Sequence, residues 1–564
     1  MIQQIDLPAD VSLAPVTIVH AGRLTCMYEK GVLRYIKMGD TELLRMIYGA
    51  VRDEAWGTLP YTIAGEEHRI SNNGFLIKFA ANYTQQEKVV YSANYSIEGR
   101  SDNSLHFSIR GLALAPFKKN RIGLCVLHPI KECRGRAVTI TRPDGSNYQS
   151  VFPEMISLHQ PLLNIQQMEW TTEDDTVLQL TFSGDVFETE DQRNWSDSSY
   201  KTYSTPLAVP YPVDIAAGDS IQQTITFRVI PGKNVASKMS APLATQKIPF
   251  PKIGFCRSPN QSLLGNTAIA LLRKIPFHHY RVTLYMGEQP WQETLHQAIE
   301  EVMALQTRLE LVVFFSDRFE VELTMLLQML APSQQLVYSM LVLRQEQGVT
   351  PAALMRAAHP SIKKWLPGTL AGYGTNSFFA DLNRQRPVGI DFDFVSFHLH
   401  PQVHAADNRT VLDNLESQPD LLATANGFAG GKPVFISPVT FQDPNSLAGT
   451  DNRAKSNFAA WFTLMSIQQL AMAGSITCCT VSGSDGLLQM EENPVPGAEG
   501  NVLTSPLYHA LTAIQSFNPI YIIKQHTGDT IVTDGLLLEN GTGARLHFKT
   551  PAAWVGFQSF SENL

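Results

Sequence analysis

The feature that most constrains this chain is a series of short apolar runs, separated by amphipathic stretches, that begins near residue 252. Buried strands of a parallel sheet read as apolar runs, and the helices that cover them carry an apolar stripe on one face. Repeats of this kind over residues 252–519 match a (β/α)8 TIM-type barrel in count and in length. A doubly wound open sheet is the alternative. The eight expected strands span residues 252–256, 280–285, 309–315, 336–343, 366–371, 392–399, 433–439 and 475–480.

Three of the intervening helices have clear signals. The stretch from Phe319 to Leu330 carries leucines at helical spacing, and Asp317 with Glu320 three residues later resembles a capping box. Large apolar side chains recur at helical spacing over residues 458–465, and the last helix is expected at residues 507–517. The apolar stripes of the helices at 319–330 and 458–465 predict that these helices are buried against the barrel.

Residues 1–231 are patterned as antiparallel strands. Residues 177–182 and 223–230 alternate, or nearly alternate, apolar and polar side chains. Asp144-Gly145 lies between two strand-like runs and predicts a hairpin, since this pair tolerates the positive φ angles of tight turns. The expected organisation is an N-terminal antiparallel β-sandwich at residues 1–231, a linker at 232–251, the barrel at 252–519 and a small C-terminal β segment at 520–564.

Composition narrows the range of partners. The 564 residues include 44 basic and 52 acidic side chains, with a net charge of -8 and no Lys/Arg block, which argues against nucleic acid or an anionic membrane as a partner. The six cysteines form no CxxC pair and are expected to be reduced thiols. There is no run of eighteen apolar residues and no signal-peptide pattern, so we expect a soluble, cytoplasmic protein.

Several common catalytic motifs are absent from the sequence. It contains no GxSxG, HExxH or GxxxxGK[ST] motif. A barrel glycosidase needs two carboxylates at strand ends. Glu346 follows the fourth expected strand, but the seventh ends in residues 436–440 without an acid. This pattern counts against a glycoside hydrolase.

The sixth expected strand ends in histidines. His398 and His400 share a face of the strand and His404 follows them, so a zinc or other divalent site is conceivable. A metal hydrolase would also need ligands from other strands. We therefore expect hydrogen-bonding histidines that line a pocket, with no metal and no cofactor.

The densest polar constellation lies in the N-terminal region, at residues 187–197 and 200–203. It is interpreted either as a salt-bridged connection between strands or as a loop that brings carboxylates and an Arg to the barrel mouth. Three further runs, at 52–58, 128–132 and 152–161, also mix acids, bases and aromatic or Pro residues. Together they predict a working surface on one edge of the sandwich.

At these residues the sequence resembles the D-apionate lactonase family, bacterial enzymes that open D-apionolactone to D-apionate. The resemblance implies an N-terminal β domain, a central TIM-type barrel and a C-terminal β segment. It is carried by VRDEAWGT at 51–58, NRIGLCVLHPIKEC at 120–133, FPEMISLHQP at 152–161, VFETEDQRNWSDSSYKTYSTPL at 186–207, GTNSFFADLNRQRP at 374–387 and PQVHAADN at 401–408.

The chain departs from the family pattern at several positions. Residues 479–486, at the end of the eighth expected strand, lack a Glu and an Arg of that pattern; Asp381 replaces a Glu and His400 an Asn. These departures leave open a diverged member that binds a sugar acid without catalysis or acts on another substrate. A glycoside hydrolase on plant saccharides is the alternative enzyme.

Opening a lactone requires an activated water, stabilisation of an oxyanion and a proton for the ring oxygen. We assign the base to Asp191 or Glu190, and the oxyanion to Arg193 and Lys201. His128 or His404 would supply the proton. The expected ligand is a small sugar lactone, and the oligomeric state stays open. The expected substrate-binding residues are Asn194, Trp195, Glu154, Asn376, His398, His400 and Gln402.

Overall fold

The computed structural model of this chain contains two compact units. The barrel unit comprises residues 2–13, 194–197 and the described residues from 243 onward, and the sandwich unit comprises residues 14–193 and 198–232. The structure describes residues 2–232, 243–259, 261–288, 290–443, 451–483, 486–490, 502–527, 530–531 and 534–554.

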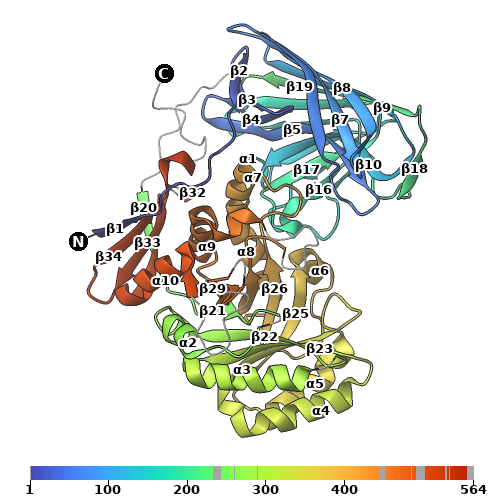
Figure 1. The fold of residues 1–564 in the computed structure, drawn as a ribbon. Helices are drawn as coiled ribbons and strands as arrows, with labels where there is room; N and C mark the ends of the chain where they lie inside the picture. The colour runs from blue at the N-terminus through green and yellow to red at the C-terminus, as the bar shows by residue number, and fades with distance from the viewer. Residues whose placement is uncertain are drawn as a thin grey trace. The chain divides into compact units, whose positions relative to one another are not determined.

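Eight parallel strands in the described part of the barrel unit close into a barrel, so the open-sheet alternative is wrong (Figure 1). Their side chains are largely buried, which explains the apolar runs in the sequence. Each corresponds to an expected strand. They are β21 (Ile253–Cys256), β22 (His279–Tyr285), β23 (Arg308–Phe315), β24 (Val337–Arg344), β25 (Leu370–Phe378), β26 (Phe394–Leu399), β27 (Val434–Val439) and β28 (Ser475–Thr480).

Strand β25 differs most from its expected range of 366–371. The strand continues to Phe378. The sequence prediction ended too early because Gly372 and Gly374, a residue type that suggests a turn, lie inside the strand. A Cβ at Gly372 would collide with the Phe394 ring, and one at Gly374 with the Ser396 carbonyl. The glycines therefore allow close approach of β26.

Helices pack around the barrel and include the three that were predicted (Figure 1). The predicted cap of α4 is wrong, because Arg318 occupies the N-cap position. Glu322 instead accepts a hydrogen bond from the Ser316 amide at 2.9 Å, while Asp317 pairs with Arg344. The helices of this unit are α2 (Asn266–Leu272), α3 (Trp291–Leu305), α4 (Phe319–Leu330), α5 (Ala352–Trp365), α6 (Phe379–Arg384), α7 (Asn408–Asp413), α8 (Gln418–Phe428), α9 (Asn457–Gln469) and α10 (Pro506–Phe517), with 3₁₀ turns η2 (Ala331–Leu336), η3 (Asn414–Ser417), η4 (Asn452–Lys455) and η5 (Ala552–Trp554).

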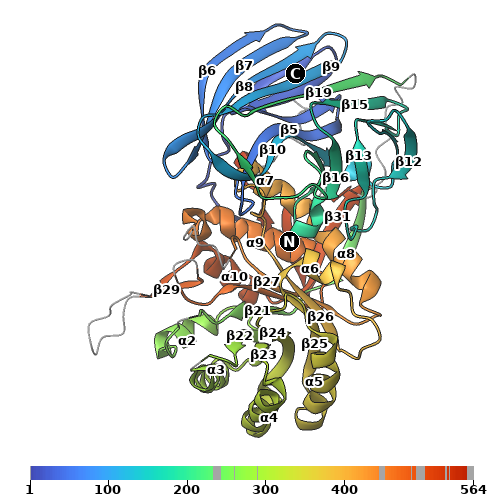
Figure 2. The ribbon, with the colours of Figure 1, turned by 90° about the vertical axis from the view of Figure 1, so that its right-hand side faces the viewer.

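The sandwich unit consists of two antiparallel sheets around one apolar core (Figure 2). One sheet contains β2 (Thr17–Ala21), β3 (Leu24–Glu29), β4 (Val32–Met38), β5 (Thr41–Asp53), β10 (Phe117–Pro129), β13 (Leu162–Ile165), β16 (Phe187–Asp191), β17 (Ser199–Tyr203) and β18 (Val213–Ile215). The other contains β6 (Tyr61–Ile70), β7 (Phe75–Gln85), β8 (Lys88–Arg100), β9 (Ser104–Ala113), β11 (Ala137–Thr141), β12 (Asn147–Val151), β14 (Gln167–Thr171), β15 (Val177–Ser183) and β19 (Ser220–Ile230). The predicted hairpin is confirmed: β11 pairs with β12, and Gly145 between them has a φ of +81°. The short α1 (Ile130–Cys133) follows β10.

A third sheet belongs to the barrel unit and confirms the expected C-terminal strands. It also recruits β1, from the N-terminal range, and β20, from the range expected to be a linker. Only Ile248 of β20 is buried, so the strand has no apolar periodicity that the sequence could reveal. Residues 233–242 of that range lie outside the described residues. The sheet contains β1 (Ile2–Asp6), β20 (Leu243–Pro249), β31 (Pro519–Thr527), β32 (Thr530–Ile531), β33 (Gly535–Asn540) and β34 (Arg545–Lys549); β29 (Leu488–Met490) pairs separately with β30 (Val502–Thr504).

No helix in the described ranges is both long enough and apolar enough to span a membrane.

Candidate functional site

Aromatic and imidazole rings gather at the carboxyl end of β26 in the barrel unit. His398 and His400 have ring centroids 5.3 Å apart, as expected for strand residues i and i+2. The Phe378 ring, from the end of β25, lies 5.2 Å from His400 and 6.2 Å from His398. Enzymes built on this barrel carry their active sites at the carboxyl ends of the strands. This cluster is therefore the candidate site.

A His–Asp pair adjoins the cluster. Asp197 belongs to the barrel unit, and its Oδ2 accepts a hydrogen bond from His404 Nδ1 at 2.5 Å. Its Oδ1 accepts one from Asn414 Nδ2 at 3.2 Å. The Asp197 carboxylate is nearly buried, whereas the His404 side chain is 21% exposed. Because Nδ1 donates to the carboxylate, the free lone pair of His404 is on Nε2, where it can accept a proton.

Trp195 connects this pair to the ring cluster. It lies in the 3₁₀ turn η1 (Gln192–Trp195), and its ring meets those of Phe378 and His404 edge to face, with centroids 5.4 and 6.3 Å away. The Arg384 guanidinium lies 5.6 Å from the centre of the Trp195 ring. These contacts fix one wall beside His404.

His400 is a neutral hydrogen-bond donor. Its Nδ1 accepts from the Gln402 amide at 3.3 Å, which leaves the ring proton on Nε2. Burial lowers the pKa of His400 to about 4, although the charges of Asp443 and Asp197 oppose the shift. Nε2 is buried and has no partner among the described residues. Such an orphan donor is costly unless a ligand satisfies it.

His398 contacts a residue that lines a neighbouring pocket. Its Nε2 lies 3.1 Å from the Thr440 hydroxyl, which donates to the Gln442 carbonyl at 2.7 Å. Burial lowers the pKa of His398 well below its ordinary value, and the charges of His400 and Arg281 add to this effect. His398 is therefore neutral at physiological pH.

The pocket, with a cavity volume of about 60 Å³, lies at the carboxyl ends of β27 and β28. Thr440 belongs both to this pocket and to the His398 hydrogen bond. Other lining residues include Phe441, Gln442, Cys479 and Thr480.

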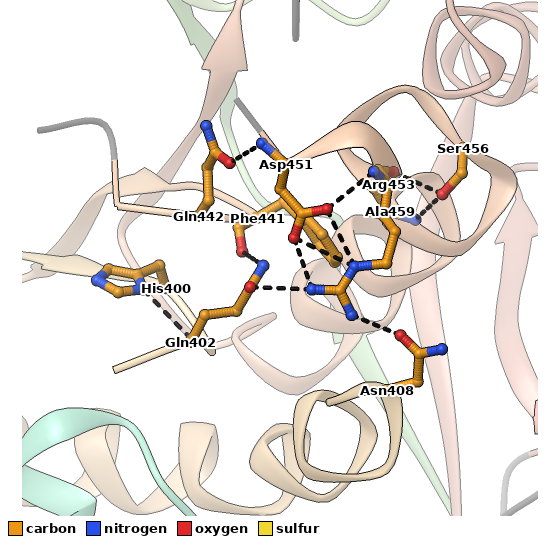
Figure 3. A network of polar contacts seen from close by, with 9 residues as sticks. All are labelled: His400, Gln402, Asn408, Phe441, Gln442, Asp451, Arg453, Ser456 and Ala459. Carbon is orange, nitrogen blue, oxygen red and sulfur yellow. Dashed lines mark hydrogen bonds and ion pairs between the residues drawn. The ribbon is translucent and has the colours of Figure 1, made fainter. Parts of the chain in front are cut away.

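A polar network holds the pocket rim, and Figure 3 shows its members. Gln402 donates from Nε2 to the Phe441 carbonyl at 2.8 Å and accepts from Arg453 Nη2 at 3.0 Å (Figure 3). Arg453 forms an ion pair with Asp451 at 2.6 Å and also donates to Asn408. Gln402 is thereby linked to His400 through its backbone N–H and to Arg453 through its side-chain oxygen.

The expected general base and oxyanion residues lie in the sandwich unit as two ion pairs. Asp191 and Arg193 have fully buried side chains 2.8 Å apart, and Arg193 also donates to the carbonyls of Pro153 and Glu154. Glu190 pairs with Lys201 Nζ at 3.0 Å. Each charge thus meets a counter-charge within the run that was singled out in the sequence.

The other predicted residues are distributed between the two units. His128 is fully buried in the sandwich unit, 2.8 Å from the Thr202 hydroxyl, and burial lowers its pKa to about 3. Glu154 is exposed in the same unit. In the barrel unit, Asn194 accepts a hydrogen bond from Asn383 at 3.0 Å, and Asn376 accepts one from Arg281.

The structure brings together five of the predicted residues: Trp195, His398, His400, Gln402 and His404. Sequence reasoning assigned no role to Asp197, although it lies in the run at 187–197. It also missed Phe378, Thr440 and Arg453. Only Asp197 and Phe378 lie in segments that carry the family resemblance, and Arg453 gave no signal in the sequence.

Among the described residues, no group of three or more His, Cys, Asp or Glu side chains is arranged to hold a metal ion. His398, His400 and His404 form hydrogen bonds with Thr440, Gln402 and Asp197 in this structure.

Comparison with known proteins gives two matches to domain models of one family. The model of the N-terminal domain of D-apionate lactonase matches residues 7–231, and the model of its TIM barrel domain matches residues 253–518. A D-apionate lactonase from Brucella anthropi is 28% identical over 530 residues, which cover 85% of this chain and 84% of the relative.

Two solved structures show a distant likeness to this chain. An α-L-arabinofuranosidase from Thermotoga maritima, in complex with arabinose, is 11% identical with a TM-score of 0.38, and the match covers 54% of this chain and 82% of that one. A family 39 glycoside hydrolase from Bacteroides cellulosilyticus is 10% identical with a TM-score of 0.36, covering 72% and 84%. At these scores the likeness says nothing about activity.

Proposed function

Because the chain belongs to the D-apionate lactonase family, we propose that it hydrolyses a sugar-acid lactone at the carboxyl end of its barrel. The observation that carries the proposal is the 2.5 Å contact between His404 Nδ1 and Asp197 Oδ2. A carboxylate in this position holds the imidazole in one tautomer and stabilises the imidazolium that forms when Nε2 takes a proton.

The reaction needs only water and the lactone. His404 Nε2 removes a proton from a water molecule while the water oxygen bonds to the lactone carbonyl carbon. The bond between that carbon and the ring oxygen then breaks, and His404 returns the proton to the departing oxygen. The product is an open-chain hydroxy acid, and His404 regains its neutral form.

His400 suits the oxyanion role. A neutral imidazole that donates from Nε2 can hydrogen-bond the lactone carbonyl oxygen as it gains negative charge, without introducing a positive charge that would hold the product carboxylate. Its orphan N–H supports this assignment. Gln402 fixes the His400 ring through its amide and stays a proposed substrate-binding residue.

The surroundings of the pair fit a small sugar. The half-buried rings of Trp195 and Phe378 offer some apolar surface for the C–H bonds of a five-membered ring, and Thr440 links His398 to the pocket. Asn194, Asn376 and His398 stay proposed partners of sugar hydroxyls. This proposal gives the remaining predicted residues structural roles. Asp191 pairs with Arg193, and Glu190 pairs with Lys201. His128 is buried and Glu154 is exposed to solvent.

The test is acid release from a panel of aldonolactones by purified His404→Gln and Asp197→Asn. Loss of a general base costs about 10²-fold or more in rate, so we expect kcat to fall at least that far in both variants. The matched control is His359→Gln, because His359 faces Asp393 at 3.7 Å elsewhere in the barrel unit. This variant should keep the wild-type rate.

Two outcomes would contradict the proposal. Wild-type turnover by a folded His404→Gln protein would remove the base. Loss of turnover in a folded Asp191→Asn protein, with His404→Gln active, would return the base role to the sandwich unit. A wild-type protein that is stabilised by a lactone but never consumes it would instead be a binding protein.

A further inference from the structure

Two aromatic rings are exposed side by side on the sandwich unit, outside the candidate site. Trp56 is 40% exposed and Tyr211 is 43% exposed, with ring centroids 5.0 Å apart and planes at 69°. Rings at this angle form two walls of a corner. Val209 and Val213, next to Tyr211 in the chain, are exposed as well. Exposed apolar side chains that gather in one patch point to a binding site more than side chains scattered singly do.

The backbone at Trp56 is strained. Its φ is +66°, a region that bulky residues rarely adopt. The turn is enforced by Asp53, whose carboxylate accepts hydrogen bonds from the amides of Ala55 at 2.9 Å and Gly57 at 2.7 Å. Strain persists only where the surroundings impose it, and it concentrates at functional sites. Here it serves to present the indole ring to solvent.

A buried guanidinium supports both rings. Arg121 lies 4.9 Å from the centre of the Tyr211 ring and 5.9 Å from that of Trp56. Its nitrogens donate to the carbonyls of Thr205, Pro206 and Val209 at 2.5, 2.7 and 3.0 Å. These bonds fix the segment that leads to Tyr211, so the corner is formed before any ligand arrives and little ordering is needed on binding.

We propose that this corner binds the ring of a neutral saccharide, separately from the barrel site. The C–H face of a sugar ring can cover one aromatic ring, while its hydroxyls stay in water or meet the Tyr211 hydroxyl. A protein partner is less suitable, because a stable interface buries about 800 Å² on each partner, far more than these four side chains offer.

The experiment measures binding of xylotriose, cellotriose and galactotriose to the full chain by titration calorimetry. The key variant is Trp56→Gly, because glycine adopts this φ without strain and the change removes the ring. We expect its thermal midpoint to stay at or above the wild-type value and its affinity for the bound trisaccharide to fall at least tenfold. Tyr211→Ala should also lose affinity, and Tyr211→Phe should keep it.

Two controls locate the site. Trp365→Ala removes another part-exposed indole, on α5, and should leave affinity unchanged. His404→Gln should bind the trisaccharide like wild type even if it has lost turnover. The proposal is overturned if none of the three sugars binds, if Trp56→Gly binds as tightly as wild type, or if binding is lost only in His404→Gln.

Discussion

At the scale of single residues, Asp191 and Asp197 show how a partner decides what a carboxylate does. Asp191 meets a buried Arg193, and their charges stay paired. Asp197 meets His404, whose Nδ1 donates to the carboxylate and whose Nε2 stays an acceptor. The sequence places both acids in one run and cannot show which one meets a histidine more than two hundred positions away. It therefore predicted the segment, but gave Asp197 no role.

The buried His128 makes stability depend on pH. Burial lowers its pKa to about 3 in the folded state, while the unfolded chain binds the proton near pH 6.5. The contribution of His128 to the free energy of unfolding is therefore fully present above about pH 6.5. Between about pH 6.5 and pH 3 this contribution falls by about 1.4 kcal/mol for each pH unit. In urea unfolding at pH 6.5, 5.5 and 4.5, His128→Asn should show a shallower loss of stability than wild type.

The exposed His159 provides the control for this prediction. His159→Asn should reproduce the wild-type dependence on pH. Parallel curves for His128→Asn and wild type would show that His128 is not held neutral in the folded protein.

At the scale of elements, helix α4 shows which local signals are decisive. The leucine spacing predicted its existence and ends correctly, because burial of one face decides where a helix forms. The cap was wrong, because tertiary contacts override it: Asp317 pairs with Arg344 on a neighbouring strand, and Glu322, not Glu320, accepts from a backbone amide, that of Ser316. Local spacing contains no information about Arg344.

The corrected cap predicts an unequal pair of substitutions. Glu322→Ala removes the acceptor for the Ser316 amide and should lower the free energy of unfolding by about 1 to 2 kcal/mol. Asp317→Ala removes an ion pair whose acid is almost fully exposed, and should cost about 0.5 kcal/mol or less. Chemical denaturation of both variants checks this order. An equal or larger loss in Asp317→Ala would restore the capping box.

At the scale of the whole molecule, the sequence predicts a sheet better when its paired strands are close together in the chain. The barrel was foreseen because each strand from β21 to β27 pairs with the next barrel strand along the chain, and each reads as a buried run. The third sheet was foreseen only in its C-terminal strands. Its strands β1 and β20 are mostly exposed and find partners far along the chain, so neither leaves a local pattern.

Trp554 also joins segments of the barrel unit that are distant in the sequence. It is almost fully buried against Phe458 and Trp461, and its Nε1 donates to the Val11 carbonyl at 2.7 Å. Trp554→Ala should lower the free energy of unfolding by about 3 to 5 kcal/mol, because it leaves a large cavity and an unpaired carbonyl. Trp365→Ala, at a part-exposed position, should cost clearly less in the same denaturation series. Similar losses would mean that Trp554 does not join these segments.

Because β1 pairs with β34, the ribosome synthesises β1 long before its partner strand exists. Val11 and Trp554 are 543 residues apart, and a ribosome adds roughly 5 to 20 residues each second, so the first strand waits roughly half a minute to two minutes for its neighbour. During that wait its backbone is an open template for other nascent chains. Gln3, Gln4 and Asp6 make β1 a polar strand that attracts other chains weakly, which suits a strand that has to stay unpaired until β34 has been synthesised.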